Sequence, residues 1–407
     1  MQAVRSPLRV LALSHNDSTE VCTFARLVTP LQALQDAGKI EYKLVTIFLR
    51  SIPSLRHMLR DLRNWDVIWI LRPHHYVVLP VISEARRLGK PILIDIDDWL
   101  LDLPTDHGDS TYFMNRPCQE TIRLALRSAT AVTTSTQVIA QRCATLGVPA
   151  HVMPNSVDIA RFTRLHRDDR DVTTIGFCGS PSHYLDMPLV MPGLRDLLQQ
   201  CPDRVRVISM GCPMPDLQGM QGYMHHESVT PAEYPQALSE LRLDIGLAPL
   251  HNTFFNNAKS DIKYLEYSAT GAATIASPVA PYQASVREDC GIFTSTNTPE
   301  AWFAAVRRLV ENPGLRQLLA SNAYEWVRGE RASSSAAMEH IWLTVFQNYV
   351  SGRMADRMVP MSQLDLDRFN RAMANIILRQ MPSDIPRIYS GLTQEAFARL
   401  SSSMRAG

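Results

Sequence analysis

The sequence predicts an α/β protein with two doubly wound domains, each a parallel β-sheet covered by helices on both faces. Short continuous apolar runs alternate with segments of helical periodicity, a pattern typical of strands that are buried on both sides. The length of 407 residues favours two domains with separate cores. Apolar residues make up 45% of the chain and charged residues 20%, which is ordinary for a globular protein.

The first domain is expected to cover residues 1–165. Apolar runs mark its strands, and amphipathic segments between them mark its helices. The expected strands are 8–13, 42–48, 66–71, 91–96, 131–134 and 151–153. The expected helices are 23–36, 53–64, 76–88 and a segment that ends at residue 146, with Gly38 and Gly89 closing the first and third.

The second domain is expected over residues 170–335, after a polar linker at 164–171. Its expected strands are 173–177, 205–210, 244–248 and 274–276. Its helices are expected at 189–200, after the capping box that runs from Thr230 to Glu233, at 298–310 and at 315–327. A further helix is expected at 336–350, and a helical tail of unknown role at 351–407.

Charge and cysteine content exclude several classes of protein. Lysine and arginine number 41 against 40 acidic residues, so the net charge of +1 indicates no general polyanion-binding surface. No apolar run reaches the length of a membrane span, and the N-terminus lacks the apolar core of a signal peptide. The 7 cysteines form no Cys-x-x-Cys pair, which is typical of reduced thiols rather than of a disulfide framework or a metal site. The expected location is cytoplasmic.

Three charged residues surround the start of a helix that is expected after Ser260. Ser260 is expected to cap this helix, and Gly271 to end it in a left-handed conformation. A lysine at a helix N-terminus is unfavourable by about 0.3–1 kcal/mol unless an anion is bound there. Lys259 and Lys263 therefore predict a phosphate site, and Glu266 supplies an acceptor for a pair of ribose hydroxyls. The alternative is an exposed helix start with a Lys263–Glu266 surface pair.

The stretch from Phe255 to Ser277 resembles the signature of the group 1 (family 4) glycosyltransferases, which are retaining enzymes with the GT-B fold. That signature has two glutamates separated by seven residues, then a run of small residues and a strand ending in serine. Glu266 stands at the second glutamate, which in the family holds the donor ribose, whereas Ala258 stands at the first. The resemblance is closer to a bacterial surface-polysaccharide subgroup, through Phe255-Asn256 and the segment from Lys259 to Glu266.

The resemblance implies two Rossmann-like domains that face a cleft, with the helix at 336–350 crossing back to the first domain. It also implies that the second domain binds a nucleotide-diphosphate sugar, that the first domain binds the acceptor, and that neither a metal nor a cofactor is needed. The segment from Met153 to Asp158 resembles the Pro-Asn-Gly-x-Asp sequence that closes the first domain in this family, with Ser156 in place of glycine.

A second candidate donor segment follows the strand at 173–177. Gly179 and Ser180 are small residues before a helix, which lets backbone amides approach a phosphate. The segment lacks the arginine and lysine of most family members and resembles the subgroup's Gly-x-x-x-His-x-x-Asp, with His183 as a hydrogen-bond donor to phosphate or sugar. Tyr282 is expected in a loop near the same site.

Polar side chains also follow the strands of the first domain, at the edge where parallel sheets bind ligands. His15 and Arg72 are the candidate acceptor contacts, with a solvated loop position and a structural ion pair as their respective alternatives. Asp97 and Asp98 are candidate catalytic residues that contact the acceptor or the transferred sugar. Two alternatives stay open for this Asp-x-Asp-Asp sequence, namely a divalent-metal site as in GT-A glycosyltransferases and a capped turn.

The sequence thus predicts a retaining, metal-independent glycosyltransferase of the hexosyl or a related class. His183 and Lys263 are expected to act in catalysis with the aspartates, because positive groups stabilise the charge that develops on the diphosphate. The acceptor stays open among glycans, lipid-linked glycans and proteins. The alternatives are a non-catalytic glycosyltransferase-like subunit or scaffold, and a metal-dependent GT-A-like transferase.

Arg56, Arg60 and Arg63 lie on one face of the helix expected at 53–64. Such a stripe favours peripheral docking on anionic lipid headgroups at the inner face of the membrane, with about 1 kcal/mol for each cation. The alternative is an ordinary solvated helix face. No nucleic-acid partner is expected.

Overall fold

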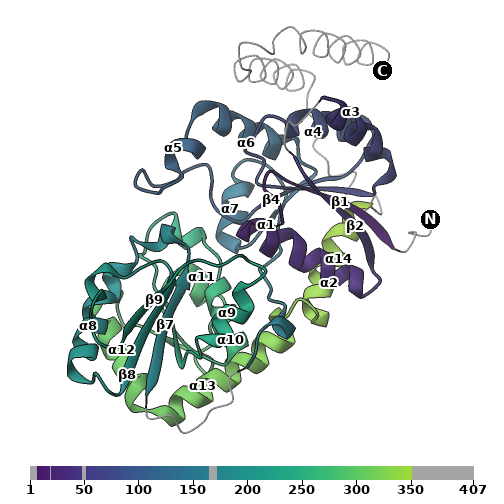
Figure 1. Cartoon of the computed structure of the whole chain (residues 1–407). Helices are drawn as coiled ribbons and strands as arrows, with labels where there is room; N and C mark the ends of the chain where they lie inside the picture. Colours follow the sequence, from purple (N-terminus) through teal and green to yellow (C-terminus); the bar gives the residue numbers. More distant parts are fainter. Residues whose placement is uncertain (1–6, 19, 48–51, 165–171, 351–407) are drawn as a thin grey trace.

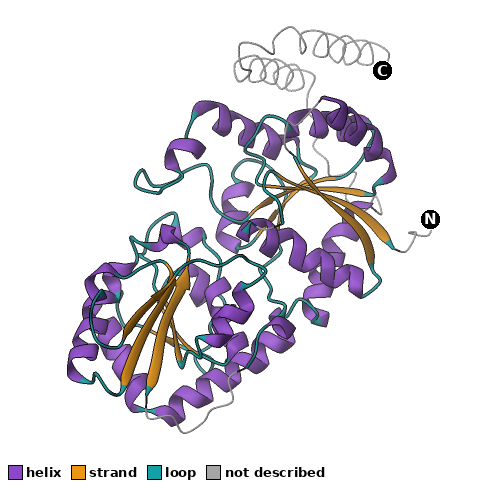
Figure 2. Cartoon of the chain, viewed as in Figure 1, coloured by secondary structure: helices purple, strands orange, loops and turns teal. Residues whose placement is uncertain are grey.

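A computed structural model describes residues 7–18, 20–47, 52–164 and 172–350, with the side chains of 52–56 excepted. Figure 1 shows two lobes, each with its own sheet, and Figure 2 shows helices on both faces of each sheet. Both sheets have six strands, and all the pairings between their strands are parallel. The α/β class with two doubly wound sheets is therefore confirmed.

The first sheet has the strand order β2-β1-β3-β4-β5-β6. Every residue of the three strands β3, β4 and β5 is buried, which is why these runs are mostly apolar in the sequence. The strands span Leu8–Ser14 (β1), Ile40–Thr46 (β2), Val67–Leu71 (β3), Ile92–Ile96 (β4), Ala131–Thr134 (β5) and Ala150–Val152 (β6).

The helices of the first lobe include two that the sequence analysis missed, α5 and α6. Asn115 caps α6 by accepting from Cys118 N at 2.9 Å, and Pro117 lies in its first turn, where proline is tolerated. The helix expected at 23–36 is one helix interrupted by a π-helical turn at Phe24–Val28. The helices span Val21–Thr23 (α1), Thr29–Asp36 (α2), Ile52–Asp61 (α3), Val78–Arg87 (α4), Ser110–Phe113 (α5), Arg116–Ser128 (α6) and Gln137–Ala144 (α7).

The second sheet has the order β12-β11-β10-β7-β8-β9, and its two edge strands, β9 and β12, were not predicted. Both are short and only partly buried, so they lack a continuous apolar run. The strands span Thr173–Gly179 (β7), Val205–Gly211 (β8), Tyr223–His226 (β9), Ile245–Ala248 (β10), Ala273–Ala276 (β11) and Ile292–Phe293 (β12).

The helices of the second lobe pack on both faces of its sheet, with α8 and α12 on one side and α9 and α10 on the other. A second π-helical turn, Val327–Arg331, follows α13. The helices span Met191–Gln200 (α8), Tyr234–Glu240 (α9), Ile262–Thr270 (α10), Ala280–Gln283 (α11), Pro299–Glu311 (α12), Pro313–Trp326 (α13) and Ala336–Val350 (α14).

Helix α14 packs on the first sheet rather than on the second. Trp342 and Phe346 are buried in the same apolar cluster as Trp69 of β3, and the Phe346 and Trp69 rings meet edge to face at 5.3 Å. The hydroxyl of Tyr349 lies 2.6 Å from His151 Nε2 of β6. Figure 1 shows α14 beside α2 in the first lobe, so the chain crosses between the lobes a second time after α13.

The carboxyl-terminal edges of the two sheets face each other. The hydroxyl of Tyr184, in the segment after β7, donates to the Asp106 carbonyl, in the segment after β4, at 2.7 Å. Thr136 Oγ1, after β5, donates to the carbonyl of Ala258, after β10, at 3.1 Å. Ligands of open parallel sheets bind at carboxyl edges, so this arrangement brings two candidate binding edges to one region.

Candidate functional site

Helix α10 starts one residue later than expected, and Ser260 does not cap it. Asp261 stands at the N-cap position without a side-chain capping bond. The hydroxyl oxygen of Ser260 instead accepts from Asn155 Nδ2 at 2.9 Å, across the two lobes. The expected stop is confirmed, because Gly271 has a left-handed φ of 81°.

Lys263 is buried in the second lobe, and the alternative of an exposed Lys263–Glu266 surface pair is wrong. The residue is 7% exposed, and its Nζ donates to the Cys178 carbonyl at 2.9 Å and lies 4.8 Å from the centre of the Phe177 ring. A Cβ atom at Gly179 would overlap Lys263 Nζ, so residue 179 must be glycine for the lysine to keep this position. Burial lowers the pKa of Lys263, and the Glu266 carboxylate opposes that shift.

Glu266 lies one turn further along α10 and is partly buried. Its Oε2 accepts from the hydroxyl of Tyr234, on α9, at 3.1 Å. Burial raises the pKa of Glu266 to about 7, although Lys263 and the bond from Tyr234 both favour the ionised form. The carboxylate is therefore an acceptor whose charge changes near neutral pH.

His183 is held by Asp186 through the i, i+3 spacing of the sequence pattern. The Nδ1 of His183 lies 3.0 Å from Asp186 Oδ2, while Asp186 Oδ1 accepts from His251 N at 2.8 Å and from Asn256 Nδ2 at 3.1 Å. Burial, with Lys263 nearby, lowers the pKa of His183 to about 3, so the ring is neutral. A proton on Nδ1 donates to this carboxylate and leaves Nε2 as an acceptor, whereas the sequence analysis expected His183 to donate.

The other candidate donor residues differ in their surroundings. Ser180 Oγ shares a hydrogen bond of 2.6 Å with Ser182 Oγ, directly after β7. Lys259 Nζ lies 4.9 Å from the Phe255 ring, at the entry to α10. Tyr282 lies in the short helix α11 rather than in the expected loop, and it is 1% exposed within an apolar cluster of the second lobe. The fold thus gathers Gly179, His183, Lys263 and Glu266 at one edge and places Tyr282 in the core behind them.

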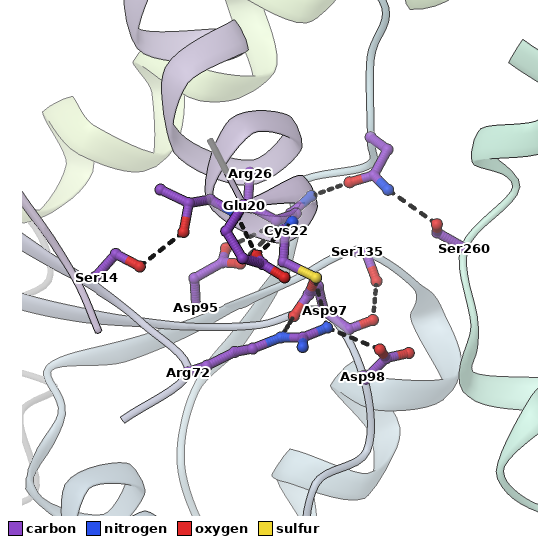
Figure 3. A network of polar contacts seen from close by, with 12 residues as sticks. Ser14, Glu20, Cys22, Arg26, Arg72, Asp95, Asp97, Asp98, Ser135 and Ser260 are labelled. Carbon is purple, nitrogen blue, oxygen red and sulfur yellow. Dashed lines mark hydrogen bonds and ion pairs between the residues drawn. The ribbon is translucent and has the colours of Figure 1, made fainter. Parts of the chain in front are cut away.

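Arg72 pairs with both candidate catalytic aspartates of the first lobe, as Figure 3 shows. Its guanidinium contacts Asp97 at 2.5 and 3.0 Å and Asp98 at 2.7 Å. Arg72 has a positive φ of 43°, a strained conformation for a residue with a side chain. The alternative of a structural ion pair for Arg72 is therefore realised, and the two aspartates lie with it at the carboxyl edge.

Asp95 is fully buried and belongs to a different network. Arg26 Nε and Nη2 donate to its two oxygens at 2.9 and 2.8 Å, and Thr133 Oγ1 donates to it at 2.6 Å. All three carboxylates of the Asp95–Asp98 segment are thus engaged by arginine, and a divalent cation would have to displace those partners. No group of three or more histidine, cysteine or acidic side chains in the described ranges has the geometry to hold a metal ion.

His15 forms a cluster with two other histidines at the end of β1. His15 is 6% exposed, and the centre of its ring lies 4.3 Å from that of His74 and 5.7 Å from that of His75. Burial and the two neighbours lower the pKa of His15 well below its ordinary value. The pKa of His74, whose Nδ1 lies 2.9 Å from the Tyr112 hydroxyl, falls to about 4. This part of the edge is therefore uncharged, and His15 is not the solvated residue of the alternative interpretation.

The segment between β10 and α10 packs against the first lobe. Phe255 and Ala258 belong to the core cluster of that lobe, and Arg142 Nη2 donates to the Phe254 carbonyl at 2.6 Å. The position at which the family signature has its first glutamate is therefore buried in a contact between lobes. Sequence reasoning missed Arg26 and Arg142, since a single arginine within a helix gives no signal.

The structure describes the basic stripe of Arg56, Arg60 and Arg63 in part and does not describe the tail. Arg60 and Arg63 are exposed, whereas the side chain of Arg56 and residues 351–407 lie outside the described residues. Within the described part of the chain, no helix combines the length and the apolar character needed to span a membrane.

Solved structures with the same architecture cover most of the chain. Anabaena HepE in complex with UDP matches with a TM-score of 0.58 at 12% identity, over 86% of this chain and all of that one. Sucrose-phosphate synthase from Thermosynechococcus elongatus matches with a TM-score of 0.62, at 12% identity over 86% of this chain and 100% of that one. A glycosyltransferase from Rickettsia africae has a TM-score of 0.60 at 10% identity, over 84% and 99% of the two chains. HepE has also been solved with UDP-glucose.

These similarities establish the fold as GT-B, with two Rossmann-like domains facing a cleft, as the sequence analysis expected. No protein-family model matches the sequence, and no curated protein matches it.

Proposed function

We propose that the protein transfers a sugar from a nucleoside-diphosphate sugar, held by the second domain, to an acceptor held by the first. The observation that carries this proposal is the position of Lys263. Its ammonium group is buried beside Gly179 at the carboxyl edge of the second sheet, with the Glu266 carboxylate one turn away. A buried cation and a nearby carboxylate suit a diphosphate and a ribose, respectively. The complexes of HepE with UDP and UDP-glucose support the same class of donor.

The electrostatics favour loss of the diphosphate. As the bond from the sugar C1 to the diphosphate oxygen breaks, negative charge grows on that oxygen, and Lys263 and Lys259 stabilise it. At 4 Å and an effective dielectric constant of 20, a lysine contributes about 4 kcal/mol of gross attraction before desolvation. The neutral His183, with Nδ1–H held by Asp186, offers Nε2 to a hydroxyl of the sugar.

The acceptor hydroxyl then bonds to C1 and transfers its proton to the departing phosphate oxygen. Asp97, Asp98 and Arg72 lie at the carboxyl edge of the first sheet and contact the acceptor or the transferred sugar in this proposal. We infer that the configuration at C1 is retained, as the family resemblance implies. Comparing the anomeric configuration of donor and product by NMR tests that step.

We further propose that the reaction needs no divalent metal, because the three carboxylates of the Asp95–Asp98 segment are already paired with Arg26 and Arg72. Transfer from UDP-glucose should continue in excess EDTA. Full loss of activity, restored by Mn²⁺ or Mg²⁺, would favour the metal-dependent alternative.

The direct test is binding of UDP by calorimetry together with hydrolysis of UDP-glucose, each compared with the variant Lys263→Met. The proposal predicts that the native protein binds UDP and releases glucose, and that the variant does neither at the same concentrations. UDP binding without hydrolysis or transfer to any glycan would favour the non-catalytic subunit. No binding of any nucleoside diphosphate would overturn the proposal.

A further inference from the structure

We propose that Asn155 is a positioning residue that aligns the two halves of the site across the domain boundary. It joins the strand end that carries Asp97 and Asp98 to the helix that carries Lys263. The inference rests on the proposed function, since it concerns how the groups of that reaction are brought together. Asn155 is 6% exposed and lies where the chain first passes between the domains.

On the side of the first domain, Asn155 is tied to β4 through Arg26. The amide oxygen of Asn155 accepts from Arg26 Nη1 at 2.8 Å, and the same Nη1 donates to the Met153 carbonyl at 2.7 Å. The rest of the Arg26 guanidinium holds both oxygens of Asp95. Figure 3 shows Arg26 between Asp95 and the side of the network that leads to Ser260. Asp97 follows Asp95 by two residues, so Asn155 is fixed to the acidic strand end.

On the side of the second domain, Asn155 is tied to the start of α10 by two routes. Its amide nitrogen donates to Ser260 Oγ at 2.9 Å. Its carbonyl accepts from Arg331 Nε at 3.0 Å and from Arg331 Nη2 at 2.7 Å, and Arg331 also holds both oxygens of Asp261, at 2.7 and 2.9 Å. Ser260 and Asp261 directly precede α10, and Lys263 is in its first turn.

The two segments of the chain that connect the domains meet beside Asn155. Val157 pairs with Ala332 in a parallel bridge, Val157 N donates to the Arg331 carbonyl at 3.1 Å, and Ser333 N donates to the Val157 carbonyl at 2.8 Å. The two arginines that flank Asn155 both come from π-helical turns, Phe24–Val28 and Val327–Arg331. Such turns are frequent at functional sites.

The burial of the network makes its geometry specific. The side chains of the Arg26–Asp95 pair are 3% and 0% exposed, and those of the Arg331–Asp261 pair are 11% and 8% exposed. A buried polar network tolerates few arrangements, because each unpaired member loses its partner without regaining water. Asn155 is the residue that links these two ion pairs.

The consequence for the reaction is a separation of binding from transfer. The candidate donor groups all belong to the second domain, namely Gly179, His183, Lys263 and Glu266. Donor binding therefore does not need the contacts of Asn155 between the domains. Transfer needs the acceptor edge of the first domain at the correct distance, and a misplacement of about 1 Å costs up to 10²-fold in rate.

The first test is the variant Asn155→Ala, with UDP affinity measured by calorimetry and steady-state turnover of UDP-glucose. We expect kcat to fall about tenfold or more while the Kd for UDP stays within about twofold. Asn155→Asp keeps the acceptor for Arg26, and the Ser260 hydroxyl then donates to it instead of accepting. Asn155→Asp should therefore retain most of kcat. The double variant Asn155→Asp with Ser260→Ala should lose this retained kcat. Ser260→Ala should have no further effect when added to Asn155→Ala.

The matched control is Asn297→Ala, which removes an amide with three bonds inside the second domain. Asn297 Oδ1 accepts from Ser277 Oγ at 2.8 Å and from Trp302 Nε1 at 3.2 Å, and Nδ2 donates to the Leu250 carbonyl at 2.7 Å. Small-angle X-ray scattering of each variant supplies a readout that does not depend on activity. Asn155→Ala should broaden the distribution of distances between the domains, whereas Asn297→Ala should lower only the melting temperature.

Two outcomes would overturn the inference. One is an Asn155→Ala protein with unchanged scattering and unchanged kcat. The other is a loss of kcat that is matched by an equal loss of UDP affinity, since a general structural role predicts that result. If the native protein binds no nucleoside diphosphate, the proposed function fails, while the scattering comparison still decides whether Asn155 sets the domain geometry.

Discussion

The carboxyl-terminal edges of the two sheets differ in how their charged side chains are paired. In the first domain, Asp95 is paired with Arg26, and Asp97 and Asp98 are paired with Arg72. In the second domain, Lys263 Nζ contacts the Cys178 carbonyl and the Phe177 ring, and none of the ion pairs found in the described residues includes it.

This difference indicates what each edge is suited to bind. A buried lysine that lacks a carboxylate at ion-pair distance gains most from an added anion, because the anion supplies the missing partner. An edge of internally paired acids and neutral histidines gains little from a charged ligand and suits hydroxyl groups. The contrast supports an anionic donor at the second domain and a hydroxylated acceptor at the first.

Removing the buried charge of Lys263 is the most direct test of this difference between the two edges. Lys263→Met keeps a chain of similar length on the Phe177 ring and deletes the charge. We expect UDP affinity to fall by on the order of 3 kcal/mol, or about 100-fold, because a charge-assisted bond to phosphate is lost. Calorimetry measures the effect, and Lys43→Met, at a lysine of β2 whose side chain is 50% exposed, is the control. Equal affinities of native protein and Lys263→Met would separate Lys263 from the donor.

Glu266→Gln tests whether the charge of this carboxylate contributes to UDP binding in the second domain. The variant should lose about 1–3 kcal/mol of UDP affinity at pH 8, where the native carboxylate is ionised and accepts from ribose. The folded pKa of about 7 lies above the ordinary value of 4.5, so the native state binds more protons between those two values. Glu266 therefore contributes stability below pH 4.5 that is lost as the pH rises through 7.

Donor affinity should change with pH in the opposite direction. The native protein should bind UDP more tightly as the pH rises from 6 to 8, because the carboxylate gains its charge, whereas Glu266→Gln should show no such rise. Calorimetric titrations at several pH values give both curves, after correction for the ionisation of UDP itself. Parallel curves would show that Glu266 does not contact the ribose.

Gly179→Ala tests whether the position of the cation matters as well as its presence. The added methyl group would overlap Lys263 Nζ and push it from the Cys178 carbonyl. We expect a loss of about 1 kcal/mol in UDP affinity with a native-like melting temperature. Gly314→Ala on α13 is the matched control, because nothing lies within 4 Å of a Cβ at that position. An equal effect of the two substitutions would contradict the expectation.

Asp97→Asn should have the smallest effect on donor affinity. Asp97 is paired with Arg72 in the first domain, so the Kd for UDP should stay within about twofold while turnover of UDP-glucose falls. Thermal melting with and without UDP checks that the variant remains folded. A large loss of UDP affinity would place Asp97 in the donor site and remove the contrast between the two edges.

The sequence by itself determined the architecture and placed one half of the candidate site on a single helix. Continuous apolar strands between amphipathic helices required parallel sheets buried on both faces, and the spacing of Lys263 and Glu266 placed both on one helix. Gly271 marked the end of that helix, because a left-handed C-terminal position favours glycine. These features depend on patterns among residues that are close together in the sequence.

Only the tertiary structure decided the partners of the charged groups. Arg26 and Asp95 are 69 residues apart in the chain, and Asn155 and Arg331 are 176 apart, so no local pattern pairs them. The same holds for Ser260, whose hydroxyl bonds to Asn155 instead of capping α10. The protonation of His183 and Glu266 followed from burial, a property that depends on which elements pack over a side chain. Charge type is set by the residue, but its partner and its pKa are set by the fold.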